Sequence, residues 1–521
     1  MPRVPGVNKA ALRARSLQTV PLAAVEYKLD GNVRAVKPYV YKFNCFAKGR
    51  WIGREIIEVC IKEFGAHPHA YWSRAIRCGF ITVNNETVAE DYKFKNSDEF
   101  VHMTHRHEPS VTGKITLVGE TESLLAVSKP SSLPMHPCGA FRYNSLLQII
   151  TNEPLIPNQP KLYIVHRLDR VTSGLVVMAK NAEVANTISE EIRSGNTEKT
   201  YLARVKGRFP AELASFKHQF SGAELLTVRY GAAAEEEYDE VGDHSKGKKS
   251  KKRKAEDLEE GAAGGIATDD VMPLHDVRAS PNVGYGYDAA YAGFLLLRCP
   301  LQVVSHREGI HACNPGGKES LSAFKMLGYD GASDTSLVMC RPVTGRTHQL
   351  RLHLQLLGNP IANDPCYGGA LFYGDEEKRK KAARALHSMQ ALGVQPLSRI
   401  PHFDTSLTED ASEMAGMARE GAAKQAETTT APAVSSSNGE EDDKRRDGES
   451  IEDYLARTCR YCRAERTIGM EDLEAALHCD GIWLHALQYK GASGWHFRTE
   501  TPDWAVVFGS LDGSTEESTP G

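Results

Sequence analysis

The sequence lacks long apolar runs and, with one exception, closely spaced cysteines. No stretch approaches about 20 consecutive apolar residues, so we do not expect the chain to span a membrane. The 11 cysteines are spread singly apart from Cys459 and Cys462. This spacing argues against a disulfide-stapled secreted domain and predicts a reduced intracellular compartment. At 41% hydrophobic and 25% charged residues, the composition also excludes a collagen, a coiled coil and wholesale disorder.

The chain has little net charge, but the charge is unevenly distributed. The formal total is −4. Residues 408–453 alone hold 13 acidic and 5 basic residues, a net charge of −8, which leaves about +4 for the rest. A mildly basic remainder is compatible with RNA as a partner without demonstrating it.

Composition and periodicity divide the 521 residues into segments. We expect a disordered basic arm (1–38), a small domain (39–110), a larger domain (114–400 and 480–507), a disordered insertion (230–290), an acidic low-complexity insertion (405–455) and a tail (508–521). The insertion contains a basic run, Lys246–Lys254. That run is either a nuclear-localisation signal or an RNA-binding arm.

Hydrophobic periodicity predicts the main helices and strands. In the small domain we expect helices near Ile56–Phe64 and Tyr71–Arg77, a strand Phe80–Val83, a turn at Asn84 and Asn85, and a strand Asp91–Val101. In the larger domain we expect strands at 124–128, 163–168, 175–179, 201–205, 336–342 and 482–489. We expect one helix after the N-cap Asn181, ending at Gly195, and another at 347–357. Because these elements do not alternate as β-α-β units, they favour an α+β fold with a mixed, mostly antiparallel sheet.

Two segments carry residues suited to chemistry. Asp169 ends a predicted strand in a turn, with arginines on both sides. An isolated aspartate there is most often only a turn residue. On the predicted helix after residue 347, His348, Arg351 and Gln355 share a polar stripe beside the Leu350/Leu354 face. A guanidinium held there can keep a carboxylate ionised, although Arg351 is equally well explained by a structural ion pair.

Four segments in order resemble the RluA-type RNA pseudouridine synthases. They are SKPSSLPMHP (128–137), HRLDRVTSGL (166–175), KTYLARVKG (199–207) and TGRTHQLRLHLQLLGNPIANDPCYG (344–368). RAIRCGFITVNNETV (74–88) resembles the ribosomal-protein-type RNA-binding domain that often precedes this catalytic domain. HRHEP (105–109) is similar to a linker of the eukaryotic tRNA-modifying branch. The resemblance covers residues 115–215, 290–400 and 480–505.

The resemblance implies isomerisation of uridine to pseudouridine, with base flipping and without a cofactor. It assigns Asp169 as the catalytic carboxylate, Arg351 as its partner and Tyr201 as the aromatic residue that stacks on the flipped base. Arg167 matches the residue that fills the space vacated in the RNA helix. We expect the RNA-binding residues to be Arg167, Arg346, His348, Arg74 and Arg77. Without the resemblance, Tyr201 would be interpreted as a tyrosine of the core and Arg167 as a charged residue in contact with solvent.

The substrate and compartment stay open at this level. We expect tRNA, with rRNA as the alternative, a monomer, and a nuclear, cytoplasmic or mitochondrial location. A protein that has lost catalysis and only binds RNA would normally lack Asp169, Tyr201 or Arg351, and all three are present. A fused deaminase would require H-x-E followed by P-C-x-x-C, and the full pattern is absent.

Two short motifs resemble parts of metal sites. Cys459 and Cys462 form a lone C-x-x-C, and His102, His105 and His107 lie along one predicted strand region. Neither motif taken alone has the second half that a zinc site needs, so we expect no bound metal.

Overall fold

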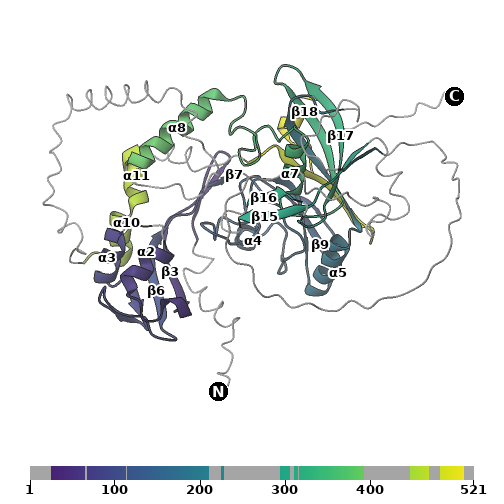
Figure 1. Ribbon diagram of the computed structural model, residues 1–521. Coiled ribbons are helices and arrows are strands. Elements are labelled where there is room, and N and C mark those ends of the chain that lie inside the picture. The colour runs from purple at the N-terminus through teal and green to yellow at the C-terminus, as the bar shows by residue number, and fades with distance from the viewer. Residues whose placement is uncertain are drawn as a thin grey trace, which may run out of the picture. The chain divides into compact units, whose positions relative to one another are not determined.

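The computed structural model describes residues 25–64, 67, 69–112, 114–210, 224–227, 294–305, 310–314, 316–391, 446, 448–468 and 481–509. The chain divides into two compact units. Figure 1 labels the helices and strands and colours them by residue number. Unit 1 comprises residues 1–189, 363–486 and 497–499, and unit 2 comprises residues 190–362, 487–496 and 500–521. No helix within these described segments has both the length and the apolarity to cross a membrane.

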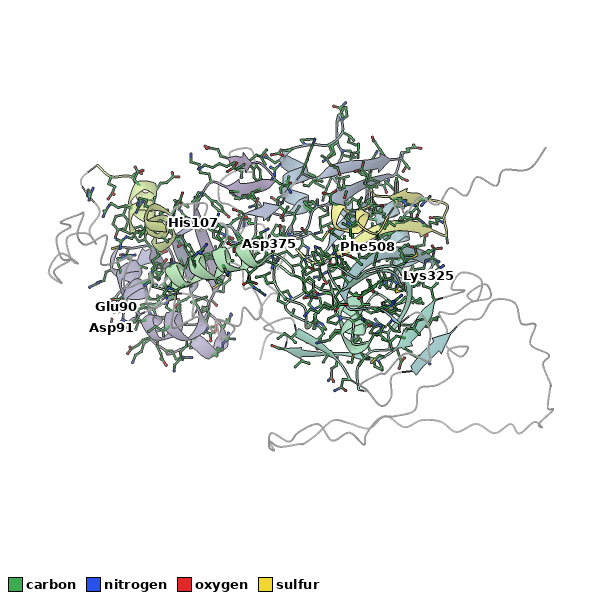
Figure 2. The ribbon with its side chains drawn as sticks, turned by 90° about the horizontal axis from the view of Figure 1, so that it is seen from above. Glu90, Asp91, His107, Lys325, Asp375 and Phe508 are labelled. Carbon is green, nitrogen blue, oxygen red and sulfur yellow. The ribbon has the colours of Figure 1, made fainter. Side chains whose placement is uncertain are left out.

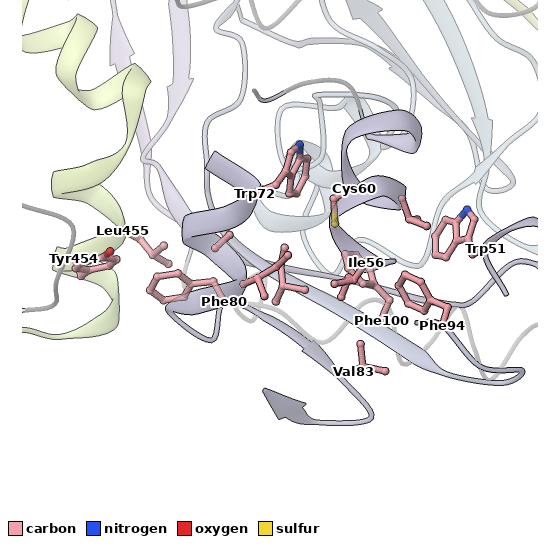
Figure 3. Packing of buried hydrophobic residues seen from close by; sticks show 14 residues of the cluster. Trp51, Ile56, Cys60, Trp72, Phe80, Val83, Phe94, Phe100, Tyr454 and Leu455 are labelled. Atoms are coloured by element: carbon pink, nitrogen blue, oxygen red, sulfur yellow. The ribbon is translucent and has the colours of Figure 1, made fainter. Parts of the chain in front are cut away.

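Unit 1 contains a small domain built from the predicted segment 39–110. Its antiparallel sheet has the order β3-β6-β4-β5. The elements are β3 (Tyr39–Phe46), the 3-10 helix η2 (Gly49–Trp51), α2 (Ile56–Glu63), α3 (His69–Arg77), β4 (Ile81–Val83), β5 (Glu86–Thr87) and β6 (Glu99–Arg106). Trp51, Trp72 and Phe100 are among the side chains of its core (Figure 3). Asn84 and Asn85, at φ 53° and 66°, turn the β4–β5 hairpin as their sequence predicts.

Two helices from far along the chain complete this small domain. They are α10 (Ile451–Thr458), whose N-cap Ser450 accepts a hydrogen bond from the Asp453 amide, and α11 (Arg460–Ile468). Tyr454 and Leu455 of α10 belong to the same buried core, and the Tyr454 ring stacks on Phe80 at 5.3 Å (Figure 3). Apolar burial therefore recruits residues 451–455, which the composition placed in the acidic insertion 405–455.

Two boundaries predicted for the N-terminal part are wrong. β1 (Tyr27–Asp30) pairs with β2 (Val33–Val36), and β2 pairs with β7 (Val111–Thr112), so residues 27–36 are not a disordered arm. The Tyr27 hydroxyl also donates to the Tyr143 carbonyl at 3.0 Å. Strand β6 begins at Glu99, not at Asp91, because the preceding residues form turns. The insertion 230–290, its basic run Lys246–Lys254 and most of the tail lie outside the described residues.

The remainder of unit 1 is a second sheet with helices. Its strands are β8 (Thr116–Glu120), β9 (Leu124–Lys129), β10 (Tyr163–Ile164), β11 (Ser173–Ala179), the start of β19 (Leu484–Gly491) and part of β20 (His496–Arg498). Its helices are α4 (Leu146–Asn152), α8 (Glu376–Ala391) and most of α5 (Ala182–Arg193). β11 is antiparallel to β9 and parallel to β19. The continuous apolar run at 175–179 is fully buried, as expected for a central strand.

Unit 2 is built on long antiparallel strands. They are β12 (Thr197–Lys206), β13 (Glu224–Thr227), β14 (Leu295–Arg298), β17 (Leu321–Asp330), β18 (Thr335–Pro342) and the rest of β19, in the order β13-β14-β17-β18-β12-β19. A separate hairpin joins β15 (Leu301–Ser305) to β16 (Ile310–Cys313), and the helices are α7 (Gln349–Leu356) and α13 (Asp503–Val506). One parallel pair among antiparallel ones confirms the predicted α+β fold with a mixed, mostly antiparallel sheet.

Gly174 permits the close pairing of β11 with β19. Its φ is +110°, and a Cβ built there would lie 2.2 Å from the Ala486 carbonyl oxygen. We expect Gly174→Ala to lower the free energy of unfolding by about 3 kcal/mol or more, because backbone strain and overlap add. Thermal unfolding measures this effect. Gly195→Ala is the matched control, since Gly195 has φ +83° with nothing within 4 Å, and equal effects of the two substitutions would contradict the close approach.

Candidate active site

Asp169 lies in a tight turn immediately before β11. Its carbonyl accepts the amide of Thr172 at 3.1 Å, and its side chain is half-buried. The strand before it, β10, ends at Ile164, so the turn region is longer than the sequence predicts. The turn is the position expected for Asp169, and it exposes part of a carboxylate rather than enclosing it.

A buried lysine is hydrogen bonded to this turn. Lys129, at the end of β9, is 0% exposed, and its ammonium donates to the carbonyls of Pro130 (2.9 Å), Leu133 (2.9 Å) and Arg170 (3.3 Å). Burial lowers the pKa of Lys129 to about 7, and the nearby Asp169 carboxylate opposes that shift. Three backbone oxygens therefore hold the Lys129 amino group next to the turn that contains Asp169.

Hydrogen bonds from two other segments of unit 1 fix the far side of the turn. The Val171 carbonyl accepts the Ile482 amide at 2.9 Å. The Ser173 hydroxyl is hydrogen bonded to Nδ1 of His485 at 2.9 Å, and Nε2 of His485 to the Thr499 hydroxyl at 2.8 Å. The turn that carries Asp169 is thus attached to β9 by Lys129 and to β19 by this chain of side chains.

Tyr201 belongs to unit 2, on β12. Its hydroxyl is hydrogen bonded to the Tyr489 hydroxyl at 2.5 Å, and the two ring centroids are 6.0 Å apart. Tyr489 is 1% exposed, and burial together with Tyr201 raises its pKa well above the usual value, which keeps Tyr489 protonated. The Tyr201 ring, itself half-buried, is held at its hydroxyl end by a neutral partner.

Lys199 occupies the same face of β12 two residues earlier. It is 8% exposed, and burial lowers its pKa to about 8. Its ammonium lies 3.7 Å from the position that a Cβ would take at Gly345. A larger residue than glycine at 345 would approach this ammonium, so the T-G-R segment passes close to β12.

Gln349 holds the loop before α7. Its side-chain oxygen accepts the Thr344 hydroxyl at 2.8 Å and the Arg346 amide at 2.9 Å. Its side-chain amide donates to the Leu321 carbonyl at 2.9 Å and to the Ser322 hydroxyl at 2.8 Å. Two of these hydrogen bonds are to the loop and two are to the start of β17, so one buried side chain sets the loop geometry.

The predicted polar stripe on α7 is only partly correct. Residues 349–354 are all buried, so the helix is enclosed on every side up to Leu354. Arg351 is 6% exposed, His348 is half-buried, and only Gln355 is exposed. The predicted stripe would require an amphipathic surface helix. The polar residues of α7 instead have polar partners inside the protein; for example, Nδ1 of His353 lies 3.0 Å from the Ser322 hydroxyl oxygen.

The residues expected to bind RNA differ in their exposure to solvent and in their contacts. Arg346 is exposed and donates to the Glu319 carbonyl at 3.1 Å, and the His348 ring lies 5.2 Å from that of His311. Arg167 is exposed beside the Asp169 turn. On α3, the Arg74 guanidinium lies 5.9 Å from the Tyr71 ring centroid, and Arg77 is exposed with its Nε 3.9 Å from a Glu90 carboxylate oxygen. These placements leave their RNA contacts a prediction.

Sequence comparison decides the family. A model described as RNA pseudouridylate synthase matches residues 123–356. The human protein pseudouridylate synthase RPUSD2 is 30% identical over 513 residues, covering 93% of this chain and 75% of its own. The chain belongs to the RNA pseudouridylate synthase family. It is an isomerase that converts uridine to pseudouridine in RNA, as the four sequence segments predict.

Other relatives of this pseudouridine synthase differ in how much of the chain they cover. The tRNA pseudouridine(31) synthase of Saccharomyces cerevisiae is 26% identical over 93% of this chain and 98% of its own. The ribosomal large subunit pseudouridine synthase C of Escherichia coli is 24% identical over 58% of this chain and 73% of its own.

The matched region of this synthase contains Asp169, Tyr201 and Arg351. Asp169 lies in unit 1, whereas Tyr201 and Arg351 lie in unit 2, so their joint role stays a prediction. Sequence reasoning assigned no role to Lys129 or Lys199. Lys129 ends a strand that is otherwise apolar, and Lys199 precedes Tyr201 at strand spacing, which are the signals that could have found them.

Proposed function

We propose that this pseudouridine synthase modifies tRNA and that Asp169 is its catalytic residue. The observation that carries the catalytic proposal is the construction of the Asp169 turn, in which the buried Lys129 donates to the Arg170 carbonyl next to the half-buried Asp169. Both routes use the Asp169 carboxylate, either as a nucleophile or as a base. The tRNA proposal is supported by the relative that acts on tRNA position 31, which matches the chain over nearly its whole length.

The chemistry exchanges one bond for another without a cofactor. The target uridine leaves its stack, the bond from N1 to C1′ of ribose breaks, and the base rotates and rejoins through C5, which then loses its proton. Asp169 either attacks C1′ or removes the proton from C2′ to form a glycal. In the first route the carboxylate leaves C1′ when C5 bonds to that carbon, and in the second route the carboxylate returns the proton to C2′ as C5 bonds to C1′. In both routes the proton lost from C5 is balanced by one gained at N1, and no electrons are gained or lost.

Tyr201 and Arg351 supply the other two roles. Tyr201 stacks on the flipped uracil, and its hydroxyl hydrogen bond to Tyr489 holds the ring at a fixed angle. Arg351 pairs with the Asp169 carboxylate through its planar set of donors. Arg167 enters the RNA helix, while Arg346, His348, Arg74 and Arg77 contact phosphates, and a monomer is sufficient for all of these contacts.

The decisive experiment for this function offers the purified enzyme two substrates. We expect tritium release from C5-labelled uridine in unmodified tRNA transcripts, with the modified position then mapped by carbodiimide primer extension, and little release from rRNA fragments. Release from rRNA alone would replace tRNA by the alternative substrate. An enzyme that binds both RNAs and releases tritium from neither would support the idle RNA-binding alternative.

Mapping pseudouridine in total RNA of cells that lack the protein extends the test to its natural target. We expect loss of modification at one or a few tRNA positions. Nuclear, cytoplasmic and mitochondrial tRNAs are scored separately, because the compartment whose tRNA loses the modification identifies where the enzyme works. Microscopy of the tagged protein checks that location independently.

A further inference from the structure

Four metal-ligating side chains from two distant segments meet in unit 1. His105 lies near the end of β6 and His107 just beyond it, and Cys459 and Cys462 lie at the junction of α10 and α11. Their four ligand atoms all lie within 4.8 Å of one another. Figure 2 labels His107, which lies beside the yellow-green helix pair. We propose that these four residues bind one Zn²⁺ ion.

The contacts within the cluster have the dimensions of a tetrahedral site. Sγ of Cys459 lies 3.3 Å from Nε2 of His107, and Sγ of Cys462 lies 3.4 Å from the same nitrogen and 3.6 Å from Nδ1 of His105. Bond lengths of about 2.3 Å to sulfur and 2.0 Å to nitrogen put tetrahedral ligands about 3.5 Å apart. The three sulfur-to-nitrogen distances therefore already match the edges around a central zinc ion.

Local backbone geometry gives each pair the spacing that a shared ion needs. His105 and His107 are two residues apart at the end of a strand, which puts both side chains on one face. Cys459 caps α10, and Cys462 lies three residues later in the first turn of α11, on the same side of the helix. Two thiolates and two imidazoles prefer zinc among the abundant divalent ions.

The cluster is shielded as structural metal sites are. Cys462 is buried, and Cys459, His105 and His107 are half-buried. The Tyr461 ring lies 5.3 Å from the His107 ring, on the side of α11. Four protein ligands leave no open position for water or substrate, so the ion would be structural rather than catalytic.

The site explains why a short helix pair returns to the small domain. α10 and α11 are separated from β6 by about 350 residues of chain, and Tyr454 and Leu455, both on α10, belong to the buried core cluster of that domain. A metal that joins such distant segments closes a long loop, which is where a cross-link contributes most. Zinc would therefore fasten α11 to β6 where apolar burial is small.

The histidines belong to a segment that also anchors the loop at residues 139–144. Arg106, between them, donates to the carbonyls of Gly139 (3.0 Å) and Ala140 (3.1 Å). The Glu108 carboxylate accepts the amides of Arg142 at 2.8 Å and Asn144 at 2.9 Å, and the amide of Tyr143 at 3.0 Å. Arg106 and Glu108 thus fix the loop at residues 139–144. An ion bound by His105 and His107 would stiffen the segment that carries these two residues.

The metal content of the full-length protein tests the proposal. The wild type is expressed with zinc, purified under reducing conditions without chelator, and analysed by inductively coupled plasma mass spectrometry. We expect about one zinc ion per chain. The double variant Cys459→Ser/Cys462→Ser should lose it, whereas Cys45→Ser, a half-buried cysteine on β3 of the same domain, should retain it.

Cobalt binding to the wild type keeps the test independent of variant folding. The apoprotein titrated with Co²⁺ should develop the visible absorption of a tetrahedral ion and the charge-transfer band of thiolate ligands, and His107→Gln should weaken both. A chelator should lower the melting temperature of the wild type but not that of the cysteine double variant. Reduced wild type without zinc and without a cobalt spectrum, or a Cys459–Cys462 disulfide under reducing conditions, would overturn the proposal.

Discussion

Asp169→Asn is expected to abolish pseudouridine formation while RNA affinity stays within a few-fold of wild type. The amide keeps the shape of the side chain but can neither attack C1′ nor remove a proton, and we expect a loss of about a thousandfold or more. The neighbouring Lys129 keeps its three carbonyl partners, so the turn should survive the substitution. Tritium release from C5-labelled tRNA measures turnover, and filter binding measures affinity.

Asp375→Asn is the matched control for this substitution. Asp375 is an exposed residue of unit 1 that caps α8, where its side-chain oxygen accepts the Lys378 amide at 3.0 Å. An asparagine caps a helix about as well, so activity and melting temperature should both be unchanged. Substantial turnover by Asp169→Asn would remove Asp169 from the catalytic role and require another nucleophile or base.

Arg351→Lys should lower kcat by about a hundredfold even though the formal charge is retained. A lysine lacks the planar fork that binds both oxygens of a carboxylate. At a position that is 6% exposed, its ammonium would also be desolvated, which lowers its pKa. Residual activity of the variant should therefore decrease as the pH rises through that lowered pKa, whereas the wild-type arginine stays charged. Single-turnover rates from pH 6 to pH 9 provide the measurement.

Arg346→Lys separates this effect from a general loss of positive charge. Arg346 is exposed on the loop before α7, and its conservative substitution should change KM for RNA rather than kcat. An Arg351→Lys enzyme with wild-type kcat and no new pH dependence would show that a simple positive charge is enough. The carboxylate-pairing role would then be wrong.

The sequence was most informative where the signal is local. The apolar run at 175–179, the Asn181 cap of α5 and the Asn84–Asn85 turn were all predicted correctly, because each depends on a few adjacent residues. Asp169 was likewise placed in a turn. The order of the four motifs predicts the family, and the family comparisons confirm it.

The errors share a physical origin. The sequence predicts an arm at residues 27–36 because short strands with polar residues have weak patterns, and only their pairing with each other and with β7 makes a sheet. The face of α7 was misjudged because burial on all sides depends on what surrounds a helix, not on its own periodicity. In both cases the composition of a short segment does not show which other part of the chain packs against it.

The sequence by itself determined the family, the α+β fold and the candidate residues Asp169, Tyr201 and Arg351, since each is encoded in short contiguous segments. Only the tertiary structure placed Lys129 next to the Asp169 turn. Likewise, only the tertiary structure brought His105 and His107 to Cys459 and Cys462. Those contacts join segments that are tens to hundreds of residues apart. These contacts form because whole helices and strands pack together, and the spacing of residues along the chain does not predict that packing.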